Sequence, residues 1–188
     1  MALEAAILSV IVGLIRRGRV GRLADLNIRW FWLVLVPVAF ILISQGGKRF
    51  VHAESWVPIT GWLHVAATVV LLAFLWANRG LPGMRWLLAG WAANLLPIAA
   101  NGGKMPVSAW AVNLTHAAKL GPHMSRHAVM SPATHFNFLA DLIPVPRPLA
   151  IMPGVISPGD VLMAVGVFVL IQLTMCPRKR GDAAGSGG

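Results

Sequence analysis

The sequence of 188 residues is 57% hydrophobic and only 12% charged, which excludes an ordinary water-soluble domain, because charged residues make up about a quarter of such domains. Sixteen lysines and arginines against six acids give a formal net charge of +10. The bases lie in short clusters between apolar runs and not on one patch of a soluble fold, so nucleic acid is excluded as a partner and the lipid bilayer is expected instead.

Five apolar runs predict an all-α fold, a polytopic helical membrane protein with about five transmembrane helices in a single domain, residues 1–180. Most runs are shorter than the ~20 residues that cross a ~30 Å hydrocarbon core, so flanking residues are expected to complete the spans. The expected spans, in chain order, are residues 2–15, 30–46, 59–77, 86–100 and 158–176. The first is expected to be a retained helix and not a signal peptide, because its positive charges follow the apolar stretch.

The distribution of bases predicts how these spans are oriented. Ten of the sixteen bases fall in short connections that five crossings place on one side of the membrane. These ten are Arg16, Arg17, Arg19, Arg22, Arg29, Arg79, Arg85, Arg178, Lys179 and Arg180. Short cytoplasmic loops are enriched in Lys and Arg, so the amino terminus is predicted outside and the carboxyl terminus in the cytoplasm. The expected location is the inner (plasma) membrane of a cell.

The long segment between the fourth and fifth spans, residues 101–157, is then external. It is too apolar and too rich in proline for a free aqueous loop, so we expect it to lie on the membrane surface or to fold back into the bundle as a re-entrant segment. Two short interfacial helices are expected within it, over residues 108–119 and over residues 131–142. The small, polar tail, residues 181–188, is expected to be disordered.

Two polar side chains inside the expected spans need partners, because hydrocarbon offers none. Asn94 lies in the fourth span, and two roles fit it: a hydrogen bond between helices, or one wall of a polar cavity that opens outward. His64 lies in the third span and is expected to form a hydrogen bond with a neighbouring helix, although a haem ligand would fit the same residue.

The turn after the fourth span contains two consecutive glycines, in the order Asn101, Gly102, Gly103, Lys104. Glycine readily takes the left-handed conformation that ends a helix, so a structural role alone accounts for the turn. The same backbone amides, together with the ammonium group of Lys104, would also bind an anion such as a phosphate or a carboxylate. The sequence leaves both roles open.

Two acids near the last span invite a functional role, because a carboxylate is costly at membrane depth. Asp160 has a local explanation, since it follows Ser157 by three residues in the spacing of a capping box at a helix start. Asp141 has no such explanation and is the best candidate for a buried functional carboxylate. The alternative for Asp141 is an ion pair with one of the nearby bases, Lys104, Arg126 or Arg147.

Four histidines gather in the external segment: His116, His123, His127 and His135. His123 and His127 have the i, i+4 spacing that places two imidazoles on one helix face, as a metal site would require. The spacing is weak evidence, because no glutamate accompanies the pair in an HExxH pattern. We therefore predict no metal and no cofactor. No catalytic residue is predicted either, because no nucleophile lies in a recognisable motif.

The order of these features resembles a family of small bacterial polytopic membrane proteins known only as a domain of unknown function. The elements that carry the resemblance are the short first helix with Arg16 to Arg22, the motif Asn101, Gly102, Gly103, Met105, Pro106, Val107, then Leu139 to Pro144 with Asp141, and finally Ser157, Gly159 and Asp160. The resemblance covers nearly the whole chain. It implies a compact helical fold in a bacterial inner membrane and no established reaction.

The leading functional hypothesis is a non-enzymatic membrane protein that binds or translocates a small or lipid-linked amphiphile at its external half. The six expected ligand-binding residues are Asn94, Asn101, Gly102, Gly103, Lys104 and Asp141. Two alternatives remain open. One is a membrane-embedded metal or haem enzyme that uses the external histidines, and the other is an accessory subunit that docks on a membrane protein partner.

Overall fold

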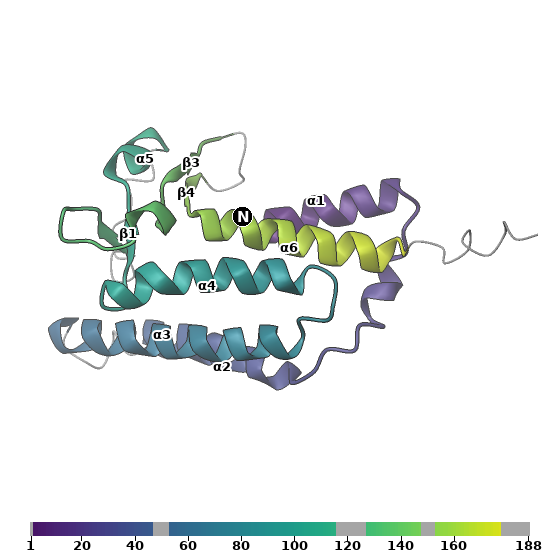
Figure 1. Ribbon diagram of the computed structural model, residues 1–188, viewed down its shortest axis with the longest axis horizontal. Helices are drawn as coiled ribbons and strands as arrows, with labels where there is room; N and C mark the ends of the chain where they lie inside the picture. The colour runs from purple at the N-terminus through teal and green to yellow at the C-terminus, as the bar shows by residue number, and fades with distance from the viewer. Residues whose placement is uncertain (1, 47–52, 116–126, 148–152, 178–188) are drawn as a thin grey trace, which may run out of the picture.

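The computed structural model describes residues 2–46, 53–115, 127–147 and 153–177, and within them five helices lie side by side with a small cap at one end (Figure 1). The five helices are α1 (Ala2–Ile15), α2 (Leu35–Gly46), α3 (Ala53–Ala77), α4 (Met84–Ala100) and α6 (Pro158–Met175). The disordered tail expected over residues 181–188 lies outside the described residues. All five helices fall where the sequence predicts apolar helices.

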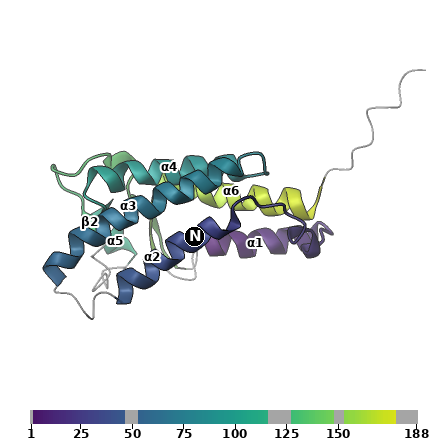
Figure 2. The same ribbon diagram turned by 90° about the horizontal axis from the view of Figure 1, so that it is seen from below.

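The helices pack as a row in the spatial order α1, α6, α4, α3, α2, so neighbours in space are not always neighbours in sequence (Figure 2). The last helix, α6, fills the gap between the first helix and the three that follow it. Buried polar contacts fix α1 to α6: the Ser9 hydroxyl donates to the carbonyl of Phe168, and the Gln172 amide donates to the backbone oxygen of Ser9. Such hydrogen bonds join helices where the surroundings are apolar.

Glycines bring α4 and α6 into backbone contact. Gly90 lies against Gly159, and Gly83, at the start of α4, lies against Gly166. A Cβ atom on Gly90 would meet the carbonyl oxygen of Gly159 at 2.5 Å. α4 and α6 are antiparallel, and on each helix the two glycines are seven residues apart. This spacing is about two helical turns, so both glycines face the neighbouring helix. The close approach of these two helices therefore depends on small residues.

Two helices are long and apolar enough to cross a membrane, α3 over Thr60–Ala77 and α6 over Pro158–Met175. The others are shorter, with 14 residues in α1, 12 in α2 and 17 in α4. α2 begins five residues later than expected because Trp30 has the left-handed φ of 56° and residues 31–34 form the 3-10 helix η2 (Phe31–Val34). The structure thus shows a mostly helical protein with two long apolar helices.

The cap consists of short elements built from residues 101–115, 127–147 and 153–157. Strand β1 (Met105–Val107) pairs in parallel with β2 (His127–Val129), and β3 (Ile143–Val145) pairs antiparallel with β4 (Gly154–Ile156). α5 (Ala109–Leu114) begins at the predicted position, with Ser108 as its N-cap. The expected helix over residues 131–142 is wrong, since only the 3-10 turn η5 (Asn137–Leu139) forms there.

The physical reason for this correction lies in local hydrogen bonds and one strained residue. The Thr134 hydroxyl donates to the carbonyl of Ser131 and accepts from its N–H, which closes a turn in place of a helix start. Phe136 then adopts a left-handed φ of 55°, which interrupts any helix. The all-α expectation is therefore corrected at the cap, where short strands satisfy the backbone polar groups of an apolar, proline-rich segment.

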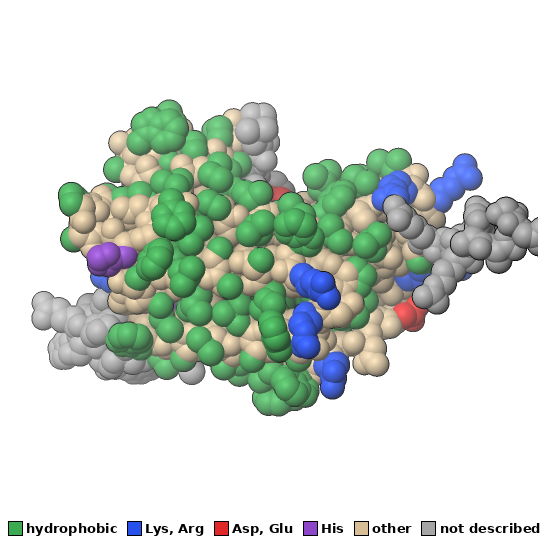
Figure 3. Space-filling model, in the orientation of Figure 1, with side chains coloured by type: hydrophobic (Ala, Val, Ile, Leu, Met, Phe, Trp, Pro, Cys, Tyr) green, Lys and Arg blue, Asp and Glu red, His purple; other side chains and the backbone are tan. Residues whose placement is uncertain are grey.

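Large apolar side chains are exposed on every one of the five helices, and they spread over the face seen in Figure 3. Examples are Leu3 at 71%, Leu42 at 67%, Trp62 at 62%, Trp86 at 49% and Leu173 at 47% exposure. Soluble monomers rarely expose contiguous apolar surface on this scale. The outer surface of the bundle is therefore matched to an apolar environment.

Candidate functional site

A polar network joins α4 to the start of α6. The Ser157 hydroxyl donates to Asn94 Oδ1 over 2.8 Å, and Asn94 Nδ2 donates to Asp160 Oδ1 over 3.2 Å. Asp160 also accepts from the N–H of Ser157, and the Ser157 hydroxyl accepts from the N–H of Asp160. This reciprocal pattern is the capping box that the sequence predicts, and the interhelical role of Asn94 is confirmed as well.

The glycine turn ends α4 as expected. Gly102 and Gly103 have positive φ values of 65° and 82°, and the N–H of Gly103 donates to the carbonyl of Ile98 over 2.8 Å, the long bond of a Schellman motif. The turn packs directly on α3, because a Cβ atom on Gly103 would collide with the backbone of Gly61. The structural role of the two glycines is therefore confirmed.

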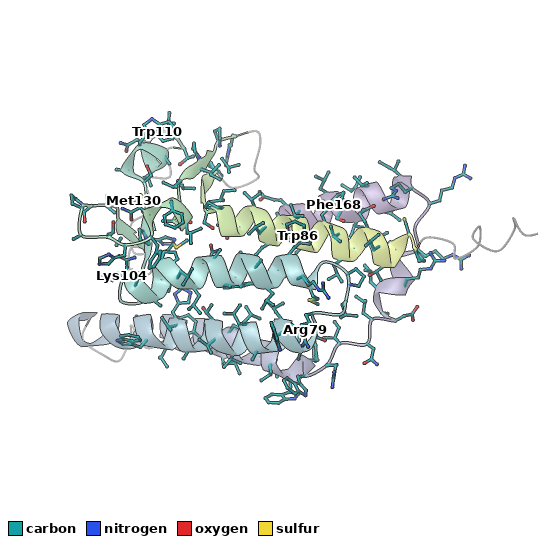
Figure 4. All side chains as sticks on the ribbon, in the orientation of Figure 1. Arg79, Trp86, Lys104, Trp110, Met130 and Phe168 are labelled. Carbon is teal, nitrogen blue, oxygen red and sulfur yellow. The ribbon has the colours of Figure 1, made fainter. Side chains whose placement is uncertain are left out.

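Asn101 ties this turn to the cap. Its side-chain amide donates to the carbonyls of Pro97 and His135, and its Oδ1 accepts from the N–H of His135. Lys104, by contrast, has no side-chain partner within the described ranges, and it lies at the cap end of the molecule (Figure 4). Of the four residues in the turn, Lys104 alone keeps its functional group available for a ligand.

Asp141 is buried in the cap, with 7% of its surface exposed, as the sequence predicts. Its backbone pairs with β1, since its N–H donates to the carbonyl of Pro106 and its carbonyl accepts from the N–H of Ser108. Its carboxylate oxygen Oδ2 lies 3.4 Å from Nε2 of His127. The partner is thus a histidine and not one of the described bases, Lys104 or Arg147, that the sequence offers as alternatives; Arg126 lies outside the described residues.

Burial raises the pKa of Asp141 above its usual value of 3.8, because the apolar surroundings disfavour the charged carboxylate. The hydrogen bond and the charge of His127 lower the pKa, but by less. The negative charge of Asp160 raises it further, which places the capping box of α6 within electrostatic reach of the cap carboxylate. The charge of Asp160 therefore acts on Asp141 where α6 meets the cap.

His127 presents a second unusual group. Its Nδ1 atom is buried and has no hydrogen-bond partner among the described residues. A buried polar atom without a partner costs roughly 1–3 kcal/mol, so its presence needs an explanation. Asp141 and His127 together form an acid–imidazole pair with one ring nitrogen to spare.

The six expected ligand-binding residues occupy three neighbouring places. Asn94 lies in the α4–α6 interface, the four residues of the turn lie between α4 and β1, and Asp141 lies beside β1. Asn94, Asn101 and Gly103 already have structural partners, whereas Lys104 and the Asp141–His127 pair remain for a ligand. Asn94 lies in the half of α4 that ends at the cap, and the other five residues lie in the cap.

Of the four histidines of the external segment, only His127 and His135 lie within the described residues. His127 starts strand β2, so the helical i, i+4 spacing with His123 does not apply at this residue. His116 and His123 lie outside the described residues. Among the residues that the structure does describe, no group of three or more His, Cys, Asp or Glu side chains could hold a metal ion.

The sequence does not reveal a pocket that lies between α2, α3 and α4. It is lined by Pro37 and Phe40 of α2, four residues of α3 that include His64, and Trp91 of α4. The His64 ring stacks on Phe40, and its Nδ1 lies 3.4 Å from the carbonyl oxygen of Gly103. The only signal in the sequence was an imidazole within an apolar run.

The fold and these groups define a mostly helical protein with two long apolar helices and a cap that holds the Asp141–His127 pair. The chain belongs to a family of unknown function, DUF5317, whose sequence profile matches residues 25–172. An uncharacterised protein of Thermotoga maritima is 27% identical over 174 residues, which cover 92% of this chain and 91% of that protein. No solved structure matches the chain. The resemblance to a family of unknown function is thereby confirmed at the level of the family.

Proposed function

We propose that this chain is an integral membrane protein with five spans, which binds or translocates a small or lipid-linked amphiphile at its cap. In this proposal α1, α2, α3, α4 and α6 all cross the membrane, the cap and the amino terminus are outside, and the carboxyl terminus is cytoplasmic. The exposed apolar side chains on all five helices support the bilayer as the surrounding solvent.

The two ends of the bundle differ in charge, which supports the orientation. The end opposite the cap carries most of the described bases, and Figures 3 and 4 show this basic end, with Arg79 labelled. These bases are Arg16, Arg17, Arg19, Arg22, Arg29, Arg79 and Arg85. The described part of the cap holds Lys104 and Arg147 with Asp141. The positive-inside rule then favours a cytoplasmic basic end in a bacterial inner membrane.

The buried Asp141–His127 pair is the observation on which ligand binding rests. A carboxylate held at 7% exposure beside an imidazole with an unpartnered buried nitrogen is unfavourable for folding, and such groups cluster at functional sites. Lys104 adds a cation at the same end of the molecule. A polar group with acidic oxygens would pair with Lys104, and a hydroxyl or amine on it would bond to the Asp141–His127 pair.

Native mass spectrometry of the purified full-length protein tests this proposal through the lipids and metabolites that co-purify. We expect Asp141→Asn and Lys104→Gln each to lower the occupancy of the bound amphiphile by about tenfold or more, because a hydrogen bond to a charged group contributes roughly 1.5–3 kcal/mol. Asp25→Asn, at the basic end, and Arg147→Gln, an exposed base of the cap, are the matched controls and should leave occupancy unchanged.

Other outcomes of these measurements would contradict the proposed site or favour one of the alternatives. Unchanged occupancy in both Asp141→Asn and Lys104→Gln, at normal expression, would exclude this site. A stoichiometric metal or a Soret band in the purified protein would favour the redox alternative, and a stable complex extracted from native membranes would favour the accessory subunit.

A further inference from the structure

The pocket between α2, α3 and α4 has a volume of about 120 Å³ and contains none of the six expected ligand-binding residues. About two turns of α3 supply most of its wall, through His64, Ala67, Thr68 and Leu71. Ala67 and Thr68 are buried at 5% and 2% exposure. The pocket therefore lies within the helical bundle and not in the cap.

Flat groups form two of its walls. Phe40 and His64 are stacked with ring centroids 5.5 Å apart and an angle of 7° between the rings. Trp91 lines the pocket from α4. Flat walls favour a flat occupant, because an aromatic pair contributes about 0.5–1.5 kcal/mol beyond the area it buries.

The volume sets the size of the occupant. An apolar cavity of about 150 Å³ in another protein binds benzene, so a pocket of about 120 Å³ is of the size of one six-membered ring. The Thr68 hydroxyl already donates to the carbonyl of His64 over 2.8 Å, which leaves the wall predominantly apolar. A ligand that reaches a site between three apolar helices is lipophilic.

We propose that this pocket binds the single planar ring of a ring-bearing membrane lipid. The inference rests on the proposed function, because it identifies the apolar part of the amphiphile. The geometry also orients the ring: His64 Nδ1 lies 3.4 Å from the carbonyl oxygen of Gly103, so the pocket adjoins the turn that leads to Lys104. A polar substituent on the ring points towards this turn.

A short-chain alkylated benzoquinone is a suitable probe, because its ring quenches tryptophan fluorescence on contact. We expect saturable quenching of the purified full-length protein in detergent. Trp91→Phe should remove the largest part of the saturable quenching. Trp86→Phe, on the same helix but 49% exposed, should leave most of it.

Two alanines on α3 give a matched pair of substitutions. Ala67 lines the pocket and is buried, whereas its neighbour Ala66 is exposed. Ala67→Leu fills the pocket and should weaken quinone binding about tenfold or more, which corresponds to about 1.4 kcal/mol. Ala66→Leu should change the affinity less than about twofold. Should Ala67→Leu fail to fold, Leu71→Trp fills the same pocket and replaces it.

Three results would overturn the inference: no saturable quenching, equal effects of Ala66→Leu and Ala67→Leu, or displacement of the quinone by a straight-chain alcohol of equal carbon number at equal concentration. The last result would show that the pocket takes alkyl chains. If the protein binds no quinone but its co-purified amphiphile still depends on Asp141 and Lys104, the ring-binding pocket is refuted and the proposed function stands. The reverse pattern would refute the cap site and leave the ring pocket.

Discussion

The surroundings of Asp141 show how an apolar protein holds a carboxylate. Strand β1 fixes its backbone from both sides, through hydrogen bonds with Pro106 and Ser108. The backbone of Asp141 is therefore held where its side chain is buried, at 7% exposure. His127 compensates only part of the cost of burial, since the pKa of Asp141 remains raised. The group is thus poised to take up a proton.

The pH dependence of stability follows from this raised pKa. The folded protein binds the Asp141 proton more tightly than the unfolded chain does, so protonation of Asp141 stabilises the folded state. This contribution to the free energy of unfolding is fully present below pH 3.8 and is lost as the pH rises through the raised pKa. We expect the thermal midpoint of the detergent-solubilised protein to fall as the pH rises from 3.8 through the raised pKa of Asp141. Asp141→Asn should flatten the fall, because the amide stays neutral at every pH.

Asp25→Asn serves as the control for this measurement, because Asp25 lies at the opposite end of the bundle. It should keep the pH profile of the parent protein. A parent-like pH profile in Asp141→Asn would mean that another group dominates the acid dependence.

At the scale of elements, the α4–α6 contact holds the two halves of the bundle together. The helices meet through two glycine pairs, Gly90 with Gly159 and Gly83 with Gly166. The capping box of α6 and Asn94 then bond across the same interface at its cap end. Close backbone approach and directional hydrogen bonds thus fix the same pair of helices, so the register of α6 determines where Asp160 lies relative to Asp141.

Gly90→Ala tests this interface. A Cβ atom at this position would meet Gly159 and Met163 at less than 2.7 Å, so the helices must separate. We expect a loss of about 1–3 kcal/mol in the free energy of unfolding, the usual cost of overpacking. Gly80→Ala is the control, because a Cβ atom there has no neighbour within 4 Å and the substitution should be nearly neutral. Equal effects of the two substitutions would argue against a close glycine contact.

The whole molecule is polarised along its long axis, with the cap at one end and most of the described bases at the other (Figures 3 and 4). Arg79 also lies over the ring of Trp76, 4.5 Å from its centroid, a pairing suited to the boundary between lipid and water. An odd number of spans would place the two termini on opposite sides.

Thiol labelling measures this topology. The chain has one cysteine, Cys176, so Cys176→Ser provides a background for single reporters. We expect Phe138→Cys, at an exposed position of the cap, to react with a membrane-impermeant maleimide in intact cells. Gly80→Cys, in the turn between α3 and α4, should react only after permeabilisation. Labelling of both reporters from one side would contradict the proposed arrangement.

Local patterns in the sequence predicted much of this protein correctly. Three features depend on residues within a few positions of one another. They are the five apolar helices, the capping box of Ser157 and Asp160 at the start of α6, and the left-handed residue Gly102 that ends α4. The surplus of apolar residues likewise predicted, without any structure, the long apolar helices α3 and α6. The helix expected over residues 131–142 failed because side-chain turns competed with it locally.

Tertiary structure alone decided which distant groups meet. His127 and Asp141 become partners only because β1 pairs with both of their segments, and Asn94 reaches Ser157 over 63 positions of sequence because glycines let α4 and α6 approach. The ring-sized pocket likewise needs three helices at once. Hydropathy and spacing report which solvent each residue prefers, but the choice among many possible partners follows from how whole helices pack, which no short stretch of sequence contains.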